Sequence, residues 1–116
     1  MTRQRTGASR PAPAQALRFH RDYLDAVRAG TKTTTVRLRE TVTTGAVRLV
    51  FELDKEAELP GVVTLLTPKR VADLTEEDAR ADGFQDVAEL HERLRYHYPG
   101  IAPADDVTVV HFRLAD

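Results

Sequence analysis

Residues 29–37 read AGTKTTTVR, and this stretch decides where the first helix ends and where a strand begins. The preceding run His20–Ala29 carries apolar residues three and four positions apart, which predicts a helix. Gly30 stands where a left-handed residue usually ends a helix. Three threonines and a valine are β-branched and predict a strand over Thr33–Arg39. The sequence therefore predicts a helix, a tight turn and a strand in succession.

The same stretch carries groups that can do chemistry. The amine of Lys32 can act as a base or nucleophile when burial or nearby cations, here Arg37 and Arg39, lower its pKa. Threonine hydroxyls can orient a carbonyl, a phosphate or water. Strict alternation would place Lys32 opposite Thr35, so the two converge only if Lys32 lies in the turn before the strand. The alternative interpretation is a threonine-rich edge strand with a solvated cation.

The rest of the chain predicts an α+β fold. Capping residues predict a short helix from Thr75 to Gly83 and a longer helix from Asp86 to Pro99. Further strands are expected near Leu17–Phe19 and over Val47–Leu53, Val62–Leu66 and Val107–Leu114, with a turn at Glu40–Gly45 and a charged hairpin loop at Asp54–Gly61. The order strand, helix, three strands, two helices, strand favours a small, partly closed β-barrel of five to six strands with about three flanking helices.

Length and composition exclude several classes of protein. The chain has 116 residues, which is the size of one domain. It has no cysteine, which excludes disulfides and Cys-ligated zinc or iron–sulfur sites. No apolar run approaches the roughly 20 residues of a membrane span. Residues 1–15 form an arginine-rich, proline-containing segment that we expect to be a disordered basic tail. The sequence thus predicts a soluble cytoplasmic domain over residues 16–116.

Charge is distributed unevenly along the chain. The net charge is −1, but residues 1–40 carry nine Lys and Arg against three Asp and Glu. Such asymmetry is typical of a basic binding face, for example one for RNA. The alternative is that several of these arginines belong only to the tail.

Other residues allow both functional and ordinary interpretations. His111 shares a strand face with an arginine and could line a cleft, although a structural role explains it as well. His91 and His97 are six residues apart, which is not the helical spacing of a metal pair, so we interpret them as surface or partly packed residues. Tyr96 and Tyr98 could stack on a base, but the apolar end of a helix explains them equally.

The motif A-G-x-K-T-x-T-x-R at residues 29–37 resembles that of the ASCH domain, a relative of the PUA fold. Further similarities follow in the same order along the chain: L-T-E-E at 74–77, D-G-F at 82–84, E-L at 89–90, Y-P-G at 98–100 and V-T-V-V-H-F from Val107. The resemblance implies a PUA-like small β-barrel with flanking helices. It also implies a cleft for RNA, a nucleotide or a modified pyrimidine nucleoside.

A small single-domain branch of this family looks most similar, and it is known as an amidohydrolase that deacetylates N4-acetylcytidine. Its catalytic Lys and Thr match Lys32 and Thr35, and Asp82 stands where that branch has a Glu. The resemblance implies that Lys32 activates water or the attacked carbonyl, that Thr35 stabilises the oxyanion, and that Asp82 moves a proton to the leaving amine. It calls for no metal and no cofactor. The candidate ligand-binding or RNA-binding residues are Thr33, Thr34, Arg37, Arg39 and His111.

Two alternatives to the amidohydrolase remain open. One is a ribonuclease that uses the same Lys32, since another branch of the superfamily resembles ribonucleases. The other is a non-catalytic module that binds single-stranded RNA. An enclosed pocket favours a nucleoside, whereas an open basic groove favours a nucleic-acid strand.

Overall fold

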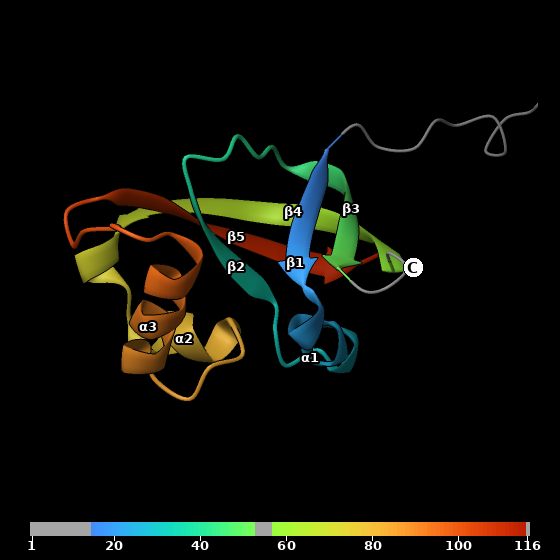
Figure 1. Cartoon of the computed structure of the whole chain (residues 1–116). Coiled ribbons are helices and arrows are strands. Elements are labelled where there is room, and N and C mark those ends of the chain that lie inside the picture. Colours follow the sequence, from blue (N-terminus) through green and yellow to red (C-terminus); the bar gives the residue numbers. More distant parts are fainter. Residues whose placement is uncertain (1–14, 53–56, 116) are drawn as a thin grey trace, which may run out of the picture.

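Five strands form one curled, mixed sheet in the computed structural model, which describes residues 15–52 and 57–115 (Figure 1). The strands are β1 (Ala16–His20), β2 (Thr34–Leu38), β3 (Gly45–Glu52), β4 (Ala57–Arg70) and β5 (Asp106–Leu114). They lie in the order β1-β3-β4-β5-β2, with β1 parallel to β3 and every other pair antiparallel. The predicted α+β class and the partly closed barrel are confirmed, in the form of a five-stranded half-barrel.

Three α-helices flank the sheet, each begun or ended by residues that the sequence marks. Helix α1 (Leu24–Ala29) follows the 3₁₀ turn η2 (Arg21–Tyr23) and ends at Gly30, whose φ is 79°. Helix α2 (Glu76–Ala81) follows η3 (Val71–Asp73) and begins with a capping box between Thr75 and Asp78. Helix α3 (Val87–His97) begins at Asp86, whose side chain accepts from the Glu89 amide. The predicted order of elements is confirmed.

The predicted hairpin loop at Asp54–Gly61 is wrong from Ala57 onward, and its residues 54–56 lie outside the described residues. Strand β4 begins at Ala57 and pairs with β3 through Pro60 and Gly61. Gly61 permits close contact here, since a Cβ at this position would lie 2.9 Å from Cδ1 of Leu49. The Pro60 carbonyl also accepts from the Ala115 amide at 2.9 Å, beyond the end of β5. Charge and proline content suggested a loop, but backbone pairing on both sides makes this segment a strand.

Two clusters of buried apolar side chains lie on opposite faces of the sheet. One packs α1 against β1, β3, β4 and β5, and comprises Leu17, Phe19, Val27, Val47, Leu49, Phe51, Val63, Val110 and Phe112. The other packs α2 and α3 against β2 and β5, and comprises Val36, Leu38, Val71, Leu74, Ala79, Leu90, Leu94, Val107 and Val109. Strand β5 contributes alternate residues to the two clusters, because successive side chains of a strand point to opposite faces.

The two edge strands, β1 and β2, are bridged by a side chain. The guanidinium of Arg37 on β2 donates from Nη2 to the carbonyl of Arg18 on β1 at 2.8 Å. It also lies 5.0 Å from the centre of the Phe19 ring. Arg37 thereby closes the gap between the edges of the half-barrel.

No helix in the described part of the chain is both long and apolar enough to cross a membrane. The predicted tail, residues 1–15, lies outside the described residues apart from Gln15.

Candidate active site

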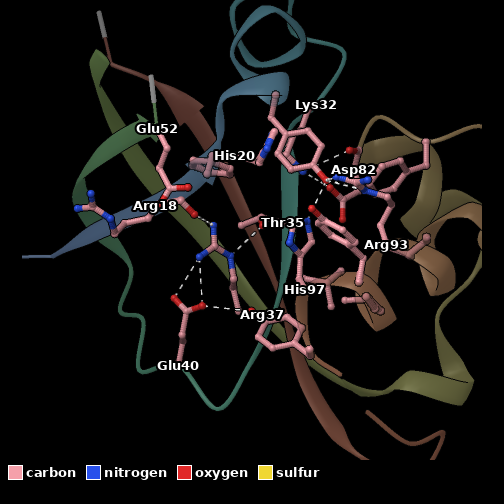
Figure 2. A pocket seen from close by; sticks show the side chains of 18 of the residues that line it. Arg18, His20, Lys32, Thr35, Arg37, Glu40, Glu52, Asp82, Arg93 and His97 are labelled. Carbon is pink, nitrogen blue, oxygen red and sulfur yellow. Dashed lines mark hydrogen bonds and ion pairs between the residues drawn. The ribbon is translucent and has the colours of Figure 1, made fainter. Parts of the chain in front are cut away.

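A pocket of about 500 Å³ opens between the edge strands, the 3₁₀ turn η2 and helix α3 (Figure 2). Its lining is rich in aromatic and charged side chains. The aromatic residues are Phe19, His20, Tyr23, Phe84, Tyr96, His97 and Tyr98, and the charged residues are Arg18, Lys32, Arg37, Glu40, Glu52, Asp82 and Arg93. The predicted set Lys32, Thr35 and Asp82 lies together in this pocket.

Lys32 reaches the pocket because it lies in the turn and not in the strand. The amides of Thr31 and Lys32 both donate to the Ala26 carbonyl, at 3.0 and 3.1 Å, and this holds the turn after Gly30. Strand β2 begins two residues later, so strand alternation does not apply to Lys32. Lys32 is only 3% exposed.

Asp82 ends helix α2 and pairs with Lys32. Its Oδ1 contacts Nζ of Lys32, and the pair is almost completely buried. The amide of Thr33 donates to the Ala81 carbonyl at 2.8 Å, which holds the end of α2 against the start of β2. A Cβ on Gly83 would lie 3.4 Å from Cβ of Lys32, so the two segments approach closely. This proximity allows the shorter Asp82 side chain to reach the amine.

The Lys32–Asp82 pair also covers the open edge of β2. Nζ of Lys32 donates to the Thr34 carbonyl at 3.0 Å, and Asp82 accepts a hydrogen bond from the backbone of Val36. Both backbone groups belong to an edge strand, whose outer side has no neighbouring strand. The ion pair therefore satisfies backbone groups that a further strand would otherwise satisfy.

Burial and mutual charge act in opposite directions on this pair. Burial lowers the pKa of Lys32, and the Asp82 carboxylate offsets part of that change. Burial likewise raises the pKa of Asp82 against the opposing charge of Lys32. The amine also lies 4.8 Å from the centre of the Tyr23 ring and 5.8 Å from those of Phe19 and Phe84. Low polarity around the pair brings its charged and neutral forms closer in energy, which suits proton transfer.

Thr35 and Arg37 form the wall beside the ion pair. Nε of Arg37 donates to the Thr35 hydroxyl at 2.9 Å, and Nη1 donates to both carboxylate oxygens of Glu40 at 3.1 Å. Because the Thr35 oxygen accepts from Arg37, its own hydrogen is left to donate. Within residues 15–52 and 57–115 that hydrogen has no acceptor, so a ligand in the pocket can take it.

Four predicted ligand-binding residues lie outside the pocket lining. Thr33 is exposed, and its hydroxyl donates to the Ala81 carbonyl at 3.4 Å. Thr34 is buried, and its hydroxyl has no partner among the described residues. Arg39 has a φ of 56°, is 75% exposed and lies 3.8 Å from Asp105, because the left-handed conformation ends the strand and turns its side chain away. Nε2 of His111 lies 3.5 Å from the Thr67 hydroxyl.

Sequence reasoning did not predict a hydrogen-bonded group that Tyr23, Arg93 and His97 form beside the Lys32–Asp82 pair. Arg93 donates to the phenol oxygen of Tyr23 from Nε at 3.1 Å and from Nη2 at 3.0 Å. The same oxygen lies 3.1 Å from Nε2 of His97. Arg93 and His97 are four residues apart, so they share one face of α3, and this spacing is the only signal that could have joined them. Tyr23 belongs to an element far away in sequence.

No group of three or more metal-ligating side chains occurs in the part of the chain that the structure describes.

Comparison with solved structures identifies the fold. An ASCH domain from Lactobacillus crispatus superimposes with a TM-score of 0.65 at 18% identity, over 78% of this chain and 68% of that one. The chain has the ASCH-domain fold. The predicted PUA-like architecture is confirmed at this level, whereas at such identity the match shows the fold alone.

Two further solved structures share the ASCH-domain fold of this chain. Protein EF3133 from Enterococcus faecalis gives a TM-score of 0.59 at 18% identity, over 79% of this chain and 66% of that one. The hypothetical protein PH0355 gives a TM-score of 0.67 at 16% identity, over 87% of this chain and 98% of that one. No protein-family model matches the sequence, and no curated protein matches it either.

Proposed function

We propose that this ASCH-fold protein hydrolyses the amide bond of an N4-acylated cytidine or a related RNA-derived substrate. The observation that carries the proposal is the buried Lys32–Asp82 pair beside the Thr35 hydroxyl in one pocket of nucleoside size. A buried acid–base pair with an adjacent hydroxyl donor has the groups that amide hydrolysis requires.

The charges of the pocket support a neutral ligand. The lysine and arginine side chains that line it all belong to residues with partners within the protein: Lys32 with Asp82, Arg37 with Glu40, Arg93 with the Tyr23 phenol, and Arg18 through a further interaction. The exposed carboxylate of Glu52 adds further negative charge to the lining. A phosphate-rich strand needs a surface of available cations. The arrangement therefore favours a nucleoside over an RNA strand.

The proposed reaction uses one water and needs no redox partner. Asp82 accepts a proton from water while the water oxygen bonds to the acyl carbon. The charge that develops on the former carbonyl oxygen is stabilised by the Lys32 ammonium and the Thr35 hydroxyl. When the C–N bond breaks, Asp82 returns the proton to the departing N4 amine, and the products are cytidine and a carboxylic acid.

The test is to incubate the full chain with N4-acetylcytidine and, separately, with a mixed-sequence RNA. We expect cytidine and acetate from the first and no cleavage of the second. Lys32→Arg should lower turnover sharply, because the wider, delocalised guanidinium places its charge differently from the ammonium that stabilises the oxyanion. Lys32→Met provides a second, uncharged variant in case the larger guanidinium does not fit.

Two outcomes would replace this proposal. RNA binding without hydrolysis, with an affinity that falls steeply as salt increases, would favour the non-catalytic RNA-binding module. Cleavage of the RNA that depends on Lys32 would favour the ribonuclease.

A further inference from the structure

The pocket lining includes a histidine whose ring nitrogens are in different environments. His97 lines the pocket, and its Nε2 lies 3.1 Å from the phenol oxygen of Tyr23. Among the described residues, nothing hydrogen-bonds to its Nδ1. Which nitrogen carries the hydrogen therefore depends on the role of the phenol.

Arg93 determines that role. It places two N–H groups on the phenol oxygen, from Nε and Nη2. If His97 also donated from Nε2, three donors would meet one oxygen and the phenol hydrogen would have no acceptor. The phenol must instead donate its hydrogen to Nε2 of His97.

We infer that Arg93 and Tyr23 lock His97 in the neutral tautomer that carries its hydrogen on Nδ1, so that His97 donates to an acceptor oxygen of the ligand. Tyr23 and Arg93 are positioning residues in this arrangement, and His97 is the residue that contacts the ligand. A neutral donor at this place selects a carbonyl oxygen, such as that of a pyrimidine ring, over an amino group. The inference uses the proposed nucleoside pocket but does not depend on hydrolysis.

The surroundings of the ring support the neutral form. Burial lowers the pKa of His97, and the neighbouring Arg93 acts in the same direction. The positive charges of Arg37 on β2, of Lys32 and of His20 on β1 when protonated lower the pKa of His97 further, and the phenol rings of Tyr23 and Tyr96 also pack against it. Burial also raises the pKa of Tyr23, so the phenol keeps the hydrogen that it donates.

The first test is the ¹⁵N NMR spectrum of the histidine side chains in the ligand-free full chain, recorded near neutral pH. We expect a protonated Nδ1 and an unprotonated Nε2 for His97. Tyr23→Phe should change this tautomer ratio and move the pKa of His97 upward, because the ring loses the donor that favours its neutral form. Tyr96→Phe is the matched control: Tyr96 also packs against His97 and Arg93 but makes no hydrogen bond to His97, so this variant should leave the tautomer unchanged.

The second test is a titration with cytidine, which carries a ring carbonyl but no acyl group. We expect the Nδ1 resonance of His97 to shift in the wild type and to shift much less in Tyr23→Phe. A wild-type spectrum with the hydrogen on Nε2 would overturn the inference, and that measurement needs no variant to fold. Shifts elsewhere in the pocket with Nδ1 unchanged would overturn the assignment of His97 as the donor. If cytidine shifts no pocket resonance, the proposal of a nucleoside ligand fails. The ligand-free spectrum alone then decides whether Tyr23 and Arg93 fix the tautomer of His97.

Discussion

Replacing Lys32 by methionine should leave the Asp82 carboxylate buried without a partner. Both side chains are at most 5% exposed, and among the described residues Asp82 retains the backbone hydrogen bond from Val36 and the more distant charge of Arg37. Removing one member of a buried ion pair costs about 3–5 kcal/mol of unfolding free energy. We expect about 3 kcal/mol, because Asp82 can escape part of the penalty by binding a proton. For a domain of this size, that lowers Tm by roughly 12–24 °C.

A second lysine–aspartate pair provides the matched control. Nζ of Lys69 lies 2.6 Å from Oδ2 of Asp78, but the Lys69 side chain is 26% exposed. Ion pairs that reach solvent contribute about 1 kcal/mol or less. In urea unfolding, Lys69→Met should therefore lower the unfolding free energy far less than Lys32→Met does, although each substitution removes one charge from one ion pair.

The dependence on pH gives this prediction its sharpest test. Burial already raises the pKa of Asp82, and without Lys32 the pKa should rise further. A carboxyl whose folded-state pKa is raised stabilises the fold below its unfolded pKa, and this stability is lost as pH rises through the folded pKa. Lys32→Met should thus become more stable, relative to Lys32→Met/Asp82→Asn, as pH falls from about 7 to about 5. If the difference in unfolding free energy between the two variants stays constant over that pH range, Asp82 is not a buried charge that needs Lys32, and the reasoning fails.

Three further outcomes follow from the same contacts. Asp82→Glu should keep turnover of N4-acetylcytidine, because the carboxylate remains, while the added methylene costs about 1–3 kcal/mol of stability in this tight site; loss of turnover in a folded variant would contradict the role given to the carboxylate. Arg37→Met should lower the unfolding free energy by at least about 2 kcal/mol, because it removes charged hydrogen bonds to Glu40, Thr35 and the Arg18 carbonyl. Arg39→Met, at an exposed position, should change the unfolding free energy by less than about 0.5 kcal/mol. Equal effects of the two substitutions would show that Arg37 does not bridge the sheet edges. Burial opposes ionisation of Asp78, but hydrogen bonds from Lys69 and Thr75 outweigh burial and lower the pKa of Asp78 below the ordinary 3.8. The stability that ionised Asp78 contributes should therefore be lost as the pH falls through its folded-state pKa. The unfolding free energy of Asp78→Asn should lack this pH-dependent loss.

The element order could be predicted because its signals are local. Gly30 ends α1, the Thr75 capping box begins α2 and Asp86 begins α3, and each depends on residues at most a few positions apart. The placement of Lys32 in a turn also followed from its neighbours. The extent of β4 did not, because Pro60 and Gly61 are strand residues only through pairing with β3 and the end of β5.

The hydrogen-bonded group of Tyr23, Arg93 and His97 could not be predicted for the same reason. Tyr23 and Arg93 are 70 residues apart, and Tyr23 and His97 are 74 apart. In the sequence Tyr23 is indistinguishable from an apolar helix residue, and its hydroxyl acquires a role only when α3 packs beside η2. The position of Arg39 was missed for a different reason, since its left-handed backbone breaks the alternation that groups it with Arg37.

Several candidate catalytic groups also hold the sheet together, so loss of activity in their variants does not by itself assign a chemical role. Lys32 and Asp82 cover the edge of β2, and Arg37 bridges β2 to β1. At Thr35 the structural role and the proposed catalytic role can be tested separately. Its hydroxyl accepts one hydrogen bond from Nε of Arg37, and valine preserves its β-branched shape in the strand.

Thr35→Val should therefore keep the fold while removing the hydroxyl that is proposed to stabilise the oxyanion. Loss of one such donor typically lowers kcat by about 10²–10³-fold. We expect a loss of that size with KM nearly unchanged, and Thr35→Ser should restore most of the rate because it returns the hydroxyl. A Thr35→Val protein that unfolds at the wild-type urea concentration and hydrolyses N4-acetylcytidine at the wild-type rate would remove Thr35 from the mechanism. The oxyanion would then have to be stabilised by the Lys32 ammonium alone.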